Sequence, residues 1–501
     1  MTAPICRGLA GCAVVLVLLL VGCQTRRTCC PQPVGLSEQW LEPDATSDNE
    51  QLAAWWTTLE SPVLDQLVSH AASGNLDLRE ASWRIAETRA RRRAAVGKYQ
   101  PQGDWKALRH DRRQSQSGNS ILPAGVGTAF ESWSVGIDAA WEVGLFRRLE
   151  HLNDAATAKQ CAAVEERRQV LVVLLAEVAD EYVHCRTLQQ QLHVARENLG
   201  WQRTNTEVAS TRHESGLTSE LDVAQASSQQ QLTEAGIPLL EAELQAAVNR
   251  IFLLIGLPPA GSAEDLLGPG RIPRVPSHLS VGMPADLLRR RPDVRQAQQE
   301  AIAESALLGL AEAELLPHLS LTGTISLDSR SFSSLFNARS LAYTLGPTLR
   351  WNLLNRGRVQ AEIDAQFARW QQALVAYERS VIAAAEEAET ALSSFARQRQ
   401  RVELLTAARQ EAGRAAKLSR TQYGNGLVSI QAVLDAHQRK LEADNLLKLA
   451  EGEAVRQVIR AYRAAGGGWE QPPPPTATDE LELSELRLVS EGLPADDGQA
   501  N

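Results

Sequence analysis

Residues 164–199 read VEERRQVLVVLLAEVADEYVHCRTLQQQLHVARENL, a stretch without proline or glycine. Apolar or small residues occupy every seventh position of this stretch, at Val164, Leu171, Val178, Cys185, Leu192 and Leu199. A seven-residue apolar repeat among strong helix formers is typical of a coiled-coil helix. Because the flanking residues are also helix formers, we expect one helix from about Leu149 to Arg212, which would be roughly 96 Å long.

A second stretch without proline, between Pro347 and Pro472, repeats the pattern. Its seam alternates in steps of three and four residues, at Tyr377, Val381, Ala384, Ala388, Ala391 and Phe395. Both long helices carry many charges on their other faces, so we do not expect them to lie in lipid, and their seams need partner helices. Shorter helices expected at about 219–255 and 62–99 would supply these partners, and Pro238 should kink the first of them or end a turn there.

The chain repeats itself at the scale of a domain. Two separations between similar residues recur. Asp77 and Asp293 lie 216 positions apart, as do Pro101 and Pro317. Trp141 and Trp351 lie 210 positions apart, as do the similar motifs Gly216–Ser219 and Gly426–Ser429. A period above 200 residues indicates a structural duplication and not a solenoid. We expect each half to contain, in order, a helix, two strands, a very long helix, a reversal and a returning helix.

Alternation with period two marks the expected strands. It is weak at 105–109, clearer at 132–141, and regular at 319–327 and 343–353. These runs have about the length that crosses a bilayer as a tilted strand. Their aromatic residues would form an interfacial belt, namely Trp133, Trp141, Tyr343 and Trp351. The polar connections, 112–131 and 328–340, are expected to be exposed loops.

Four strands cannot close a membrane barrel, because the smallest closed barrels use about eight and unpaired strand edges are costly in lipid. Either several chains pool their strands, or the strands are not transmembrane. Three chains would supply about twelve strands, but strand patterning alone does not choose that number.

The N-terminus carries one apolar run, Leu9–Val21, after a start that contains Arg7. Its thirteen residues fall short of the about 20 that a spanning helix needs, so we expect a secretory signal peptide. The run ends in Leu20-Val21-Gly22-Cys23, which resembles the bacterial lipobox and implies cleavage before Cys23 and acylation of its sulfur and amine. The alternative is a signal followed by an incidental cysteine. Gln24, in place of Asp, implies sorting to the outer membrane.

Composition and cysteine spacing exclude several classes of function. The chain of 501 residues is 44% hydrophobic and 22% charged, and its formal net charge of −9 argues against a nucleic-acid partner. Cys161 and Cys185 would lie about 36 Å apart on one helix and cannot form a disulfide, whereas the adjacent Cys29 and Cys30 carry further acyl chains or nothing. No metal-ligand spacing, phosphate loop, HExxH or nucleophile motif occurs, so we expect no enzyme activity, catalytic residue, metal or cofactor.

Three motifs extend these observations, namely WEVGLFRR at Trp141–Arg148, LRWNLLNRG at Leu349–Gly357 and GIPLLEA at Gly236–Ala242. Together with the duplication, the element order and the lipobox, they resemble the TolC-like outer-membrane efflux proteins over roughly residues 40–465. The resemblance is greatest to the NodT-type lipoprotein subgroup, which serves resistance-nodulation-division efflux systems. Gly144 and Arg147 depart from the first motif, where the family usually has Asp and Gly.

The resemblance implies a mainly α chain with a transmembrane β-barrel. Each chain would contribute four strands and long coiled-coil helices to a homotrimer, in which a twelve-stranded β-barrel stands on a periplasmic α-barrel. The expected segments are a signal peptide (1–22), a lipidated N-terminal segment (23–59), a first structural repeat (60–257), a linker (258–280), a second structural repeat (281–465) and a disordered acidic tail (466–501).

The two reversals, Gly216-Leu217-Thr218-Ser219 and Gly426-Leu427-Val428-Ser429, each break a long helix. Glycine permits the positive φ that ends one helix, and serine can cap the next. The resemblance implies that both hairpins form the periplasmic tip, where an adaptor protein docks. The alternative is a helical hairpin and nothing more.

The resemblance also implies a pore constriction formed by Asp435, Tyr423 and Asp222. A ring of Asp435 carboxylates would favour cations and bind divalent ions, and Tyr423 would help to hold the tip closed. Asp222 has the capping-box spacing after Ser219, so helix capping is its alternative role. For Asp435 the alternative is a solvated helix charge, and the nearby His437 is expected to be a surface residue outside any catalytic dyad.

Two departures from the family concern the gate. Val428 stands where some members have an arginine, and Ala432 where some have a second acidic ring. We therefore expect the links that gate the tip to be weaker or differently built.

The function implied is that of a passive outer-membrane duct for small molecules such as drugs, toxic compounds or metal ions. An inner-membrane efflux pump would hand over the cargo through a periplasmic adaptor. Two alternatives stay open, a type I protein-secretion outlet of the same fold and a structural coiled-coil lipoprotein without a pore.

Overall fold

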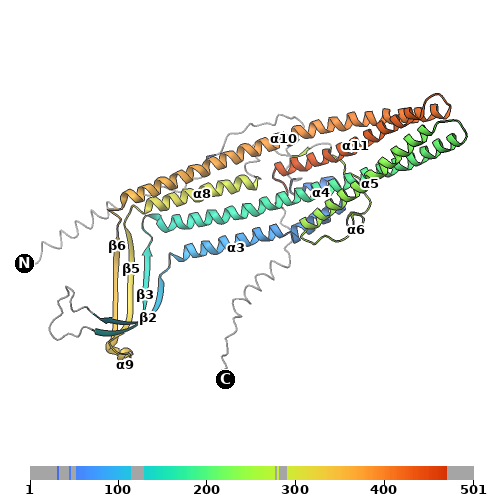
Figure 1. Cartoon of the computed structure of the whole chain (residues 1–501). Helices are drawn as coiled ribbons and strands as arrows, with labels where there is room; N and C mark the ends of the chain where they lie inside the picture. The colour runs from blue at the N-terminus through green and yellow to red at the C-terminus, as the bar shows by residue number, and fades with distance from the viewer. Residues whose placement is uncertain are drawn as a thin grey trace, which may run out of the picture. The chain divides into compact units, whose positions relative to one another are not determined.

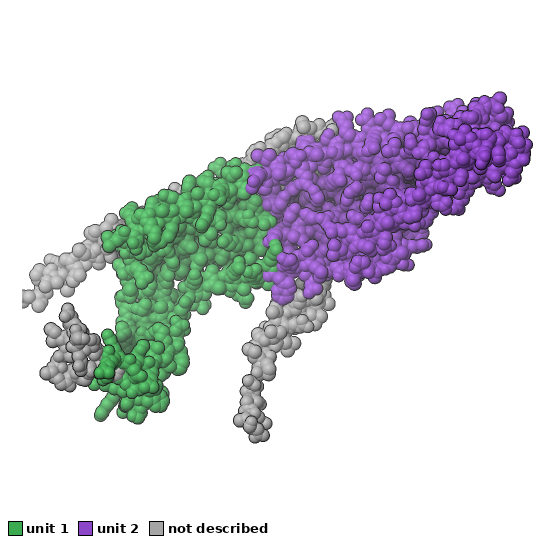
Figure 2. All heavy atoms as spheres, viewed as in Figure 1, with its two compact units in different colours: residues 1–33, 84–164, 296–378 green, residues 34–83, 165–295, 379–501 purple. Residues whose placement is uncertain are grey.

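The computed structural model describes residues 31–32, 45–46, 52–113, 129–276, 279–280 and 290–470. The chain divides into two compact units (Figure 2). Unit 1 comprises Met1–Pro33, Arg84–Val164 and Gln296–Glu378, and unit 2 comprises Val34–Trp83, Glu165–Arg295 and Arg379–Asn501. Each unit therefore draws on both halves of the sequence. The expectations for the signal peptide, for Cys23, Cys29 and Cys30, and for residues beyond 470 lie outside the described residues.

The expected element order is confirmed in both halves (Figure 1). The first half contains α2 (Pro62–Gly74), α3 (Leu76–Gly97), β2 (Gln102–Arg113), β3 (Ala129–Val143), α4 (Arg148–Glu214) and α5 (Glu220–Leu254). The second half contains α8 (Pro292–Ala313), β5 (His318–Ser329), β6 (Leu341–Arg350), α10 (Arg356–Gly424) and α11 (Ile430–Ala464). Within the described residues, no helix combines the length and the apolar character that a membrane crossing needs.

One helix prediction needs correction. The helix expected at 62–99 is two helices, because Asn75 between α2 and α3 has extended backbone angles. The Asn75 side chain accepts from the Leu78 amide (3.0 Å) and donates to the Leu254 carbonyl (2.9 Å), so the break also joins α3 to the end of α5. The helix α5 does not end at Pro238 but continues through it.

Unit 1 contains a four-stranded antiparallel sheet in the order β2-β3-β5-β6. Trp105, Ile137, Ile325 and Tyr343 lie opposite one another across all four strands, and 56–79% of each side chain is exposed. The neighbouring row is polar and consists of Asp104, Asp138, Thr324 and Thr344. The prediction of strands with one apolar face is therefore confirmed.

Equivalent tryptophans anchor the two halves of unit 1. The indole Nε1 of Trp141 donates to the Tyr99 carbonyl (2.8 Å), and that of Trp351 donates to the Leu315 carbonyl (3.0 Å). Each acceptor lies two residues before the proline that precedes the first strand of its half. The same hydrogen bond in both halves supports the duplication that the sequence separations predicted.

The connection 328–340, expected to be an exposed loop, is partly helical. It contains α9 (Phe332–Leu335) and a 3-10 turn, η4 (Ala338–Ser340). Leu335 is fully buried, and Phe332 packs edge-on against Trp133 with ring centroids 5.1 Å apart. This end of the sheet is therefore covered by its own small apolar cluster.

Unit 2 holds the main hydrophobic core, which contains part of each coiled-coil seam. Leu171, Val178, Cys185, Leu192 and Leu199 are all buried, whereas Val164, in unit 1, is only half-buried. Burial raises the pKa of the Cys185 thiol to about 12, so this cysteine is an inert packing residue. Cys185 and the exposed Cys161 are both free, as their spacing predicted.

The expected boundaries shift where the chain joins this core. The 3-10 helix η2 (Trp55–Leu59) belongs to the core, and Trp55 stacks on Tyr462 with centroids 5.6 Å apart. Gly466–Gly468 are buried as well, with Gly467 against Leu52. The first residues of the expected acidic tail are therefore part of the folded unit.

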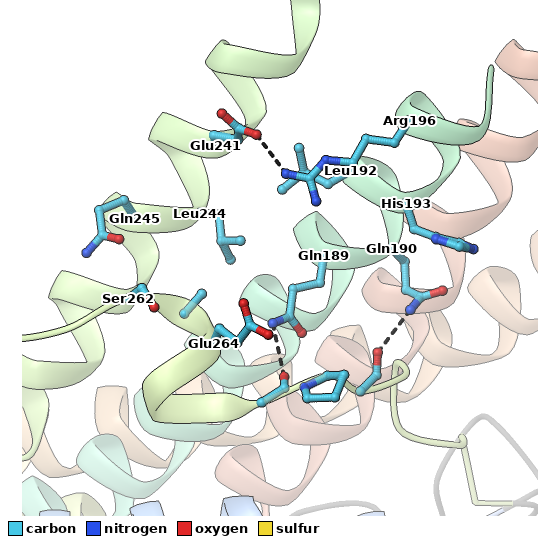
Figure 3. A pocket seen from close by; sticks show the side chains of 14 residues that line it. Gln189, Gln190, Leu192, His193, Arg196, Glu241, Leu244, Gln245, Ser262 and Glu264 are labelled. Carbon is cyan, nitrogen blue, oxygen red and sulfur yellow. Dashed lines mark hydrogen bonds and ion pairs between the residues drawn. The ribbon is translucent and has the colours of Figure 1, made fainter. Parts of the chain in front are cut away.

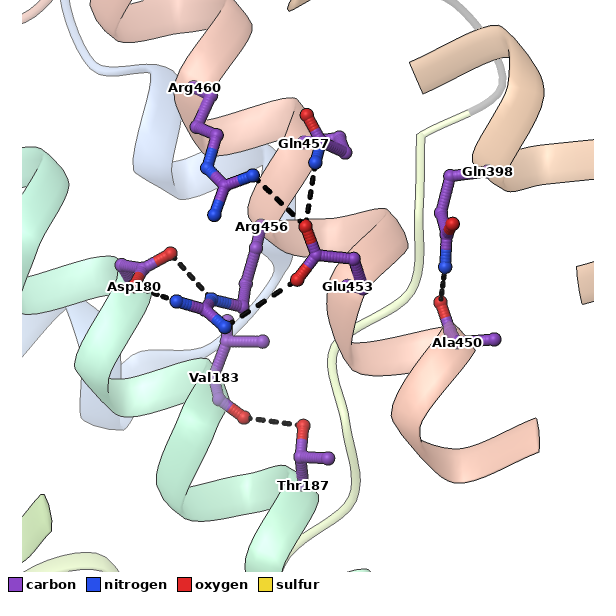
Figure 4. A network of polar contacts seen from close by, with 9 residues as sticks. All are labelled: Asp180, Val183, Thr187, Gln398, Ala450, Glu453, Arg456, Gln457 and Arg460. Atoms are coloured by element: carbon purple, nitrogen blue, oxygen red, sulfur yellow. Dashed lines mark hydrogen bonds and ion pairs between the residues drawn. The ribbon is translucent and has the colours of Figure 1, made fainter. Parts of the chain in front are cut away.

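A polar network joins α4 to α11 inside unit 2 (Figure 4). The Arg456 guanidinium donates to both carboxylate oxygens of Asp180, each at 2.7 Å. Close by, Gly452 lies directly over Thr187, where a Cβ would approach Thr187 Oγ1 to 2.1 Å. The two helices therefore pack at a distance that only glycine permits.

The linker between the halves is attached to α4 by hydrogen bonds from α4 side chains to linker carbonyls. Arg186, 3% exposed, donates to the Leu267 carbonyl (2.9 Å) and the Gly268 carbonyl (2.7 Å). Gln190 donates to the Gly270 carbonyl (2.9 Å) (Figure 3). The linker also forms its own short helix, α6 (Ala263–Leu267), whose N-terminus has a capping box at Ser262.

Candidate functional site

The candidate site is the end of unit 2 at which both long helices reverse (Figure 1). Gly216 ends α4 with φ of 70°, and Gly426 ends α10 with φ of 73°. In the first reversal, the Gly216 and Leu217 amides donate to carbonyls of the last helical turn, each at 2.8 Å. The second reversal repeats these bonds at 3.0 and 2.9 Å. Both turns are therefore glycine-dependent Schellman caps, as predicted for their glycines.

The two returning helices begin differently. Ser219 accepts a hydrogen bond from the Asp222 amide (3.4 Å), which confirms it as the N-cap of α5. The Asp222 carboxylate also accepts from the Thr218 hydroxyl. Ser429 occupies the N-cap position of α11, but its side chain makes no capping hydrogen bond. Val428 has no hydroxyl to match that of Thr218, so the second reversal lacks the side-chain bonds of the first.

A contact that sequence reasoning missed joins the two reversals. The Arg212 guanidinium lies 4.7 Å from the centroid of the Tyr423 ring, and its Nη1 donates to the Tyr423 carbonyl (3.3 Å). Burial, followed by the nearby Asp222 carboxylate, raises the pKa of Tyr423, while Arg212 opposes that shift. The Tyr423 hydroxyl is buried and has no hydrogen-bond partner among the described residues. No motif marked Arg212, because its partner is 211 positions away.

Asp435 stands apart from this contact. It is exposed on α11, and its carboxylate accepts from the Gln431 amide one turn earlier (2.8 Å). Among the described residues, no hydrogen bond joins Asp435 to Tyr423 or Asp222. Of the three predicted constriction residues, one protomer therefore brings Tyr423 and Asp222 near each other and leaves Asp435 facing solvent.

The apex of each reversal presents an apolar side chain. Leu217 is 69% exposed and Leu427 is 73% exposed, and the two lie at equivalent positions of the duplication. An exposed leucine on each of two neighbouring turns is suited to contact with another protein.

The expectation that His437 is a surface residue is wrong. Only 7% of it is exposed, and its ring lies 4.6 Å from that of Trp201 on α4. The Arg420 guanidinium lies 4.3 Å from the Trp201 ring, so α10 joins the same stack. Burial, then the charges of Lys440 and Arg420, lower the pKa of His437. A single sequence does not reveal such a stack, because its members come from three helices.

Metal ligands are not assembled at this site. Across the described ranges, no group of three or more His, Cys, Asp and Glu side chains is arranged to hold a metal ion.

Comparison with known proteins gives a consistent set of relatives. A family model described as "Outer membrane efflux protein" matches residues 67–257 and 283–467. The cation efflux system protein CusC of Escherichia coli is 32% identical over 452 residues, which cover 88% of this chain and 93% of CusC. Nodulation protein T of Rhizobium leguminosarum is 27% identical over 467 residues, which cover 90% of this chain and 96% of that protein.

Solved structures agree with the sequence relatives. The structure of the outer-membrane channel OprN superposes with a TM-score of 0.81 at 30% identity, covering 89% of this chain and 100% of that one. A structure of CusC superposes with a TM-score of 0.73 at 27% identity, covering 89% of this chain and 99% of that one.

Proposed function

This chain belongs to the outer membrane efflux protein family, and we propose that three copies of it assemble into a passive export duct. It is an outer-membrane component of an efflux system, and its family consists of channels rather than enzymes. A passive duct has no energy source of its own. We infer that an inner-membrane pump drives export and that a periplasmic adaptor connects the pump to this channel.

The observation that supports the proposal most strongly is the amphipathic sheet of unit 1, which has one apolar and one polar face. An exposed apolar row across four strands is suited to lipid, and the polar row beside it is suited to a water-filled lumen. The sheet ends in two edge strands, β2 and β6. In lipid these edges need partners, and the corresponding edges of two further copies would supply them in a closed barrel of about twelve strands.

In unit 2, we propose the two reversals as the docking surface for the adaptor. The residues concerned are Gly216, Leu217, Thr218 and Ser219 with Gly426, Leu427, Val428 and Ser429. Support comes from the backbone hydrogen bonds that both turns have in common and from the exposed Leu217 and Leu427 at their apices.

We propose the constriction of the duct at Asp435, Tyr423 and Asp222. Asp435 is exposed and bonded only by an amide, so its carboxylate is available to cations. Asp222 is already engaged by Thr218 and lies in the first turn of α5, which favours a supporting role through helix capping. Opening would be a loosening of one hairpin against the other, a packing change biased by the adaptor.

The anchor and the cargo complete the proposal. We propose that Cys23 is acylated. Metabolic labelling with palmitate tests this, since the label should disappear in Cys23→Ser.

We propose that residues 60–257 and 281–465 are the two structural repeats, which the linker joins. Relatives are named for cations, pyoverdine and toluene, so we propose only that the cargo is small molecules.

A matched pair of substitutions on neighbouring residues of β6 tests the proposal. Leu345 belongs to the apolar face and is 72% exposed, whereas Thr344 belongs to the polar row. A lysine near the middle of the lipid face costs about 2–4 kcal/mol. We expect Leu345→Lys to abolish insertion of the trimer into lipid vesicles and Thr344→Lys to leave it intact. Equal insertion of both variants would show that the sheet does not face lipid.

A further inference from the structure

A basic cavity lies within unit 2, roughly two to three helical turns from the reversals. It has a volume of about 500 Å³ and is walled by α4, α10 and α11. Arg409, Arg414 and Lys417 of α10 line it, together with Lys440 of α11. No acidic residue is among its lining residues.

A buried imidazole marks the inner wall of this cavity. Only 7% of His437 is exposed, and its Nε2 has no hydrogen-bond partner among the described residues. Its ring packs on Trp201, which is a lining residue too. This nitrogen is closed off from solvent, so the imidazole contributes to the wall through its packing on Trp201 and not through a hydrogen bond to an occupant.

The positive charge of the lining is only partly neutralised. Asp444, which does not line the cavity, accepts from Arg409 (2.6 Å) and Lys440 (3.1 Å). Arg414 lies 3.9 Å from Glu411 across an exposed surface, where such a contact is weak. Lys417 forms no ion pair with any described residue. A cavity with surplus guanidinium and ammonium groups is suited to an oxyanion.

We propose that this cavity binds a small multivalent oxyanion, which accepts hydrogen bonds from the cationic side chains of α10 and α11. Its walls come from both hairpins, since Trp201 lies on α4 while the cations and His437 lie on α10 and α11. The bound anion would therefore hold the two hairpins together. This second statement rests on the proposed function, because it makes the anion a brake on opening of the tip.

Gly413 offers a way to fill the cavity without disturbing its charges. It is a lining residue in the middle of α10, and a Cβ placed there meets no atom within 4 Å. In Gly413→Leu the new side chain would enter open space. In Gly413→Ala, the matched control, helix propensity rises similarly while most of the cavity stays empty.

The experiment is titration of the purified full-length protein in detergent with inorganic phosphate, followed by calorimetry at constant ionic strength with chloride as the balancing anion. We expect saturable binding to the wild type and to Gly413→Ala. Affinity should fall about tenfold or more in Gly413→Leu, Lys417→Gln and Arg414→Gln, since each loses space or a charge-assisted bond. Heat-stable trimer in every variant shows that the fold is intact.

Three outcomes would overturn the site. These are no saturable binding to the wild type, equal binding in all variants, and a loss in Gly413→Ala as large as in Gly413→Leu. A trimer that weakens only in Gly413→Leu, without phosphate binding to the wild type, would also overturn it and assign the cavity to a side chain of the neighbouring copy.

The brake is tested separately in a planar bilayer. Phosphate should lower the open probability of the wild type several-fold and leave Gly413→Leu unchanged. Binding without this effect would remove the brake and keep the site. A complete lack of channels would contradict the proposed function, while the calorimetric result would still decide the site.

Discussion

Arg212 and Tyr423 connect the two reversals of unit 2 through one cation–π contact and one hydrogen bond. A cation–π contact of this kind contributes about 0.5–1 kcal/mol near a surface. If the tip opens by separating the hairpins, Arg212→Gln should raise the open probability by about two- to fivefold. Single-channel recording measures this change directly.

Arg203→Gln is the control for this substitution. Arg203 lies on the same helix and pairs with Glu234 (2.8 Å) at a surface where both side chains are more than half exposed. Its loss should change stability and opening little. Equal opening of the two variants would mean that the Arg212 contact does not hold the tip.

Glu387 links stability to pH. Burial alone would raise the pKa of this carboxyl, but Arg291 and Arg463 outweigh burial and lower the pKa below its ordinary value of 4.5. A carboxyl with a lowered folded-state pKa stabilises the fold above its ordinary pKa, and this contribution is lost as the pH falls through the folded-state value.

The corresponding variant is Glu387→Gln. At pH 7 it should lose about 1–3 kcal/mol, because the buried Arg291 would lose one of its two charged partners and keep only Asp293. The gap between wild type and variant should close well below pH 4.5. Thermal dissociation of the trimer at several pH values tests this, and a gap that does not depend on pH would contradict the assignment.

Single residues were also where sequence reasoning failed most. Arg147, at a position where the resembling family usually has glycine, adopts φ of 61°. The motif at Trp141–Arg148 therefore marks a left-handed backbone conformation at this position, which glycine adopts easily and Arg147 adopts under strain. His437 was expected at the surface because helical spacing alone does not show that Trp201, 236 positions away, covers it.

At the scale of elements, α4 and α11 depend on the close approach at Gly452. A Cβ there would lie 2.1 Å from Thr187 Oγ1, and Thr187 is buried. We expect Gly452→Ala to lower stability by about 1–3 kcal/mol despite its better helix propensity. Gly236→Ala, in a helix where a Cβ meets nothing within 4 Å, should be neutral or stabilising. Urea unfolding followed by far-UV circular dichroism compares the two, and equal effects would contradict the packing account.

Elements with a strong period were predictable and irregular ones were not. Both seams and the strands β3, β5 and β6 follow from spacing, because apolar residues on one face must be buried or meet lipid. The alternation of β2 is weak, and β6 ends at Arg350, three residues before the expected end. The break at Asn75, the helix α9 and the attachment of the linker to Arg186 depend on contacts between distant residues. Such contacts leave no local pattern in the sequence.

At the scale of the whole molecule, the duplication explains both the sheet and the tip. Each half contributes two strands to unit 1 and one helical hairpin to unit 2. The halves differ in the side-chain bonds of their reversals, where Thr218 and Asp222 have no equivalent bond in the second copy. We therefore expect the α10–α11 hairpin to be the more mobile one when the channel opens.

The most direct measurement is single-channel conductance of the purified protein in a planar bilayer, for the wild type and for Asp435→Ala. The account predicts small openings that favour cations in the wild type, with reduced cation preference and weaker block by divalent ions in the variant. Openings unchanged by the substitution would remove Asp435 from the constriction and keep the duct. No openings at all, even in Arg212→Gln, would contradict the channel and favour a structural lipoprotein.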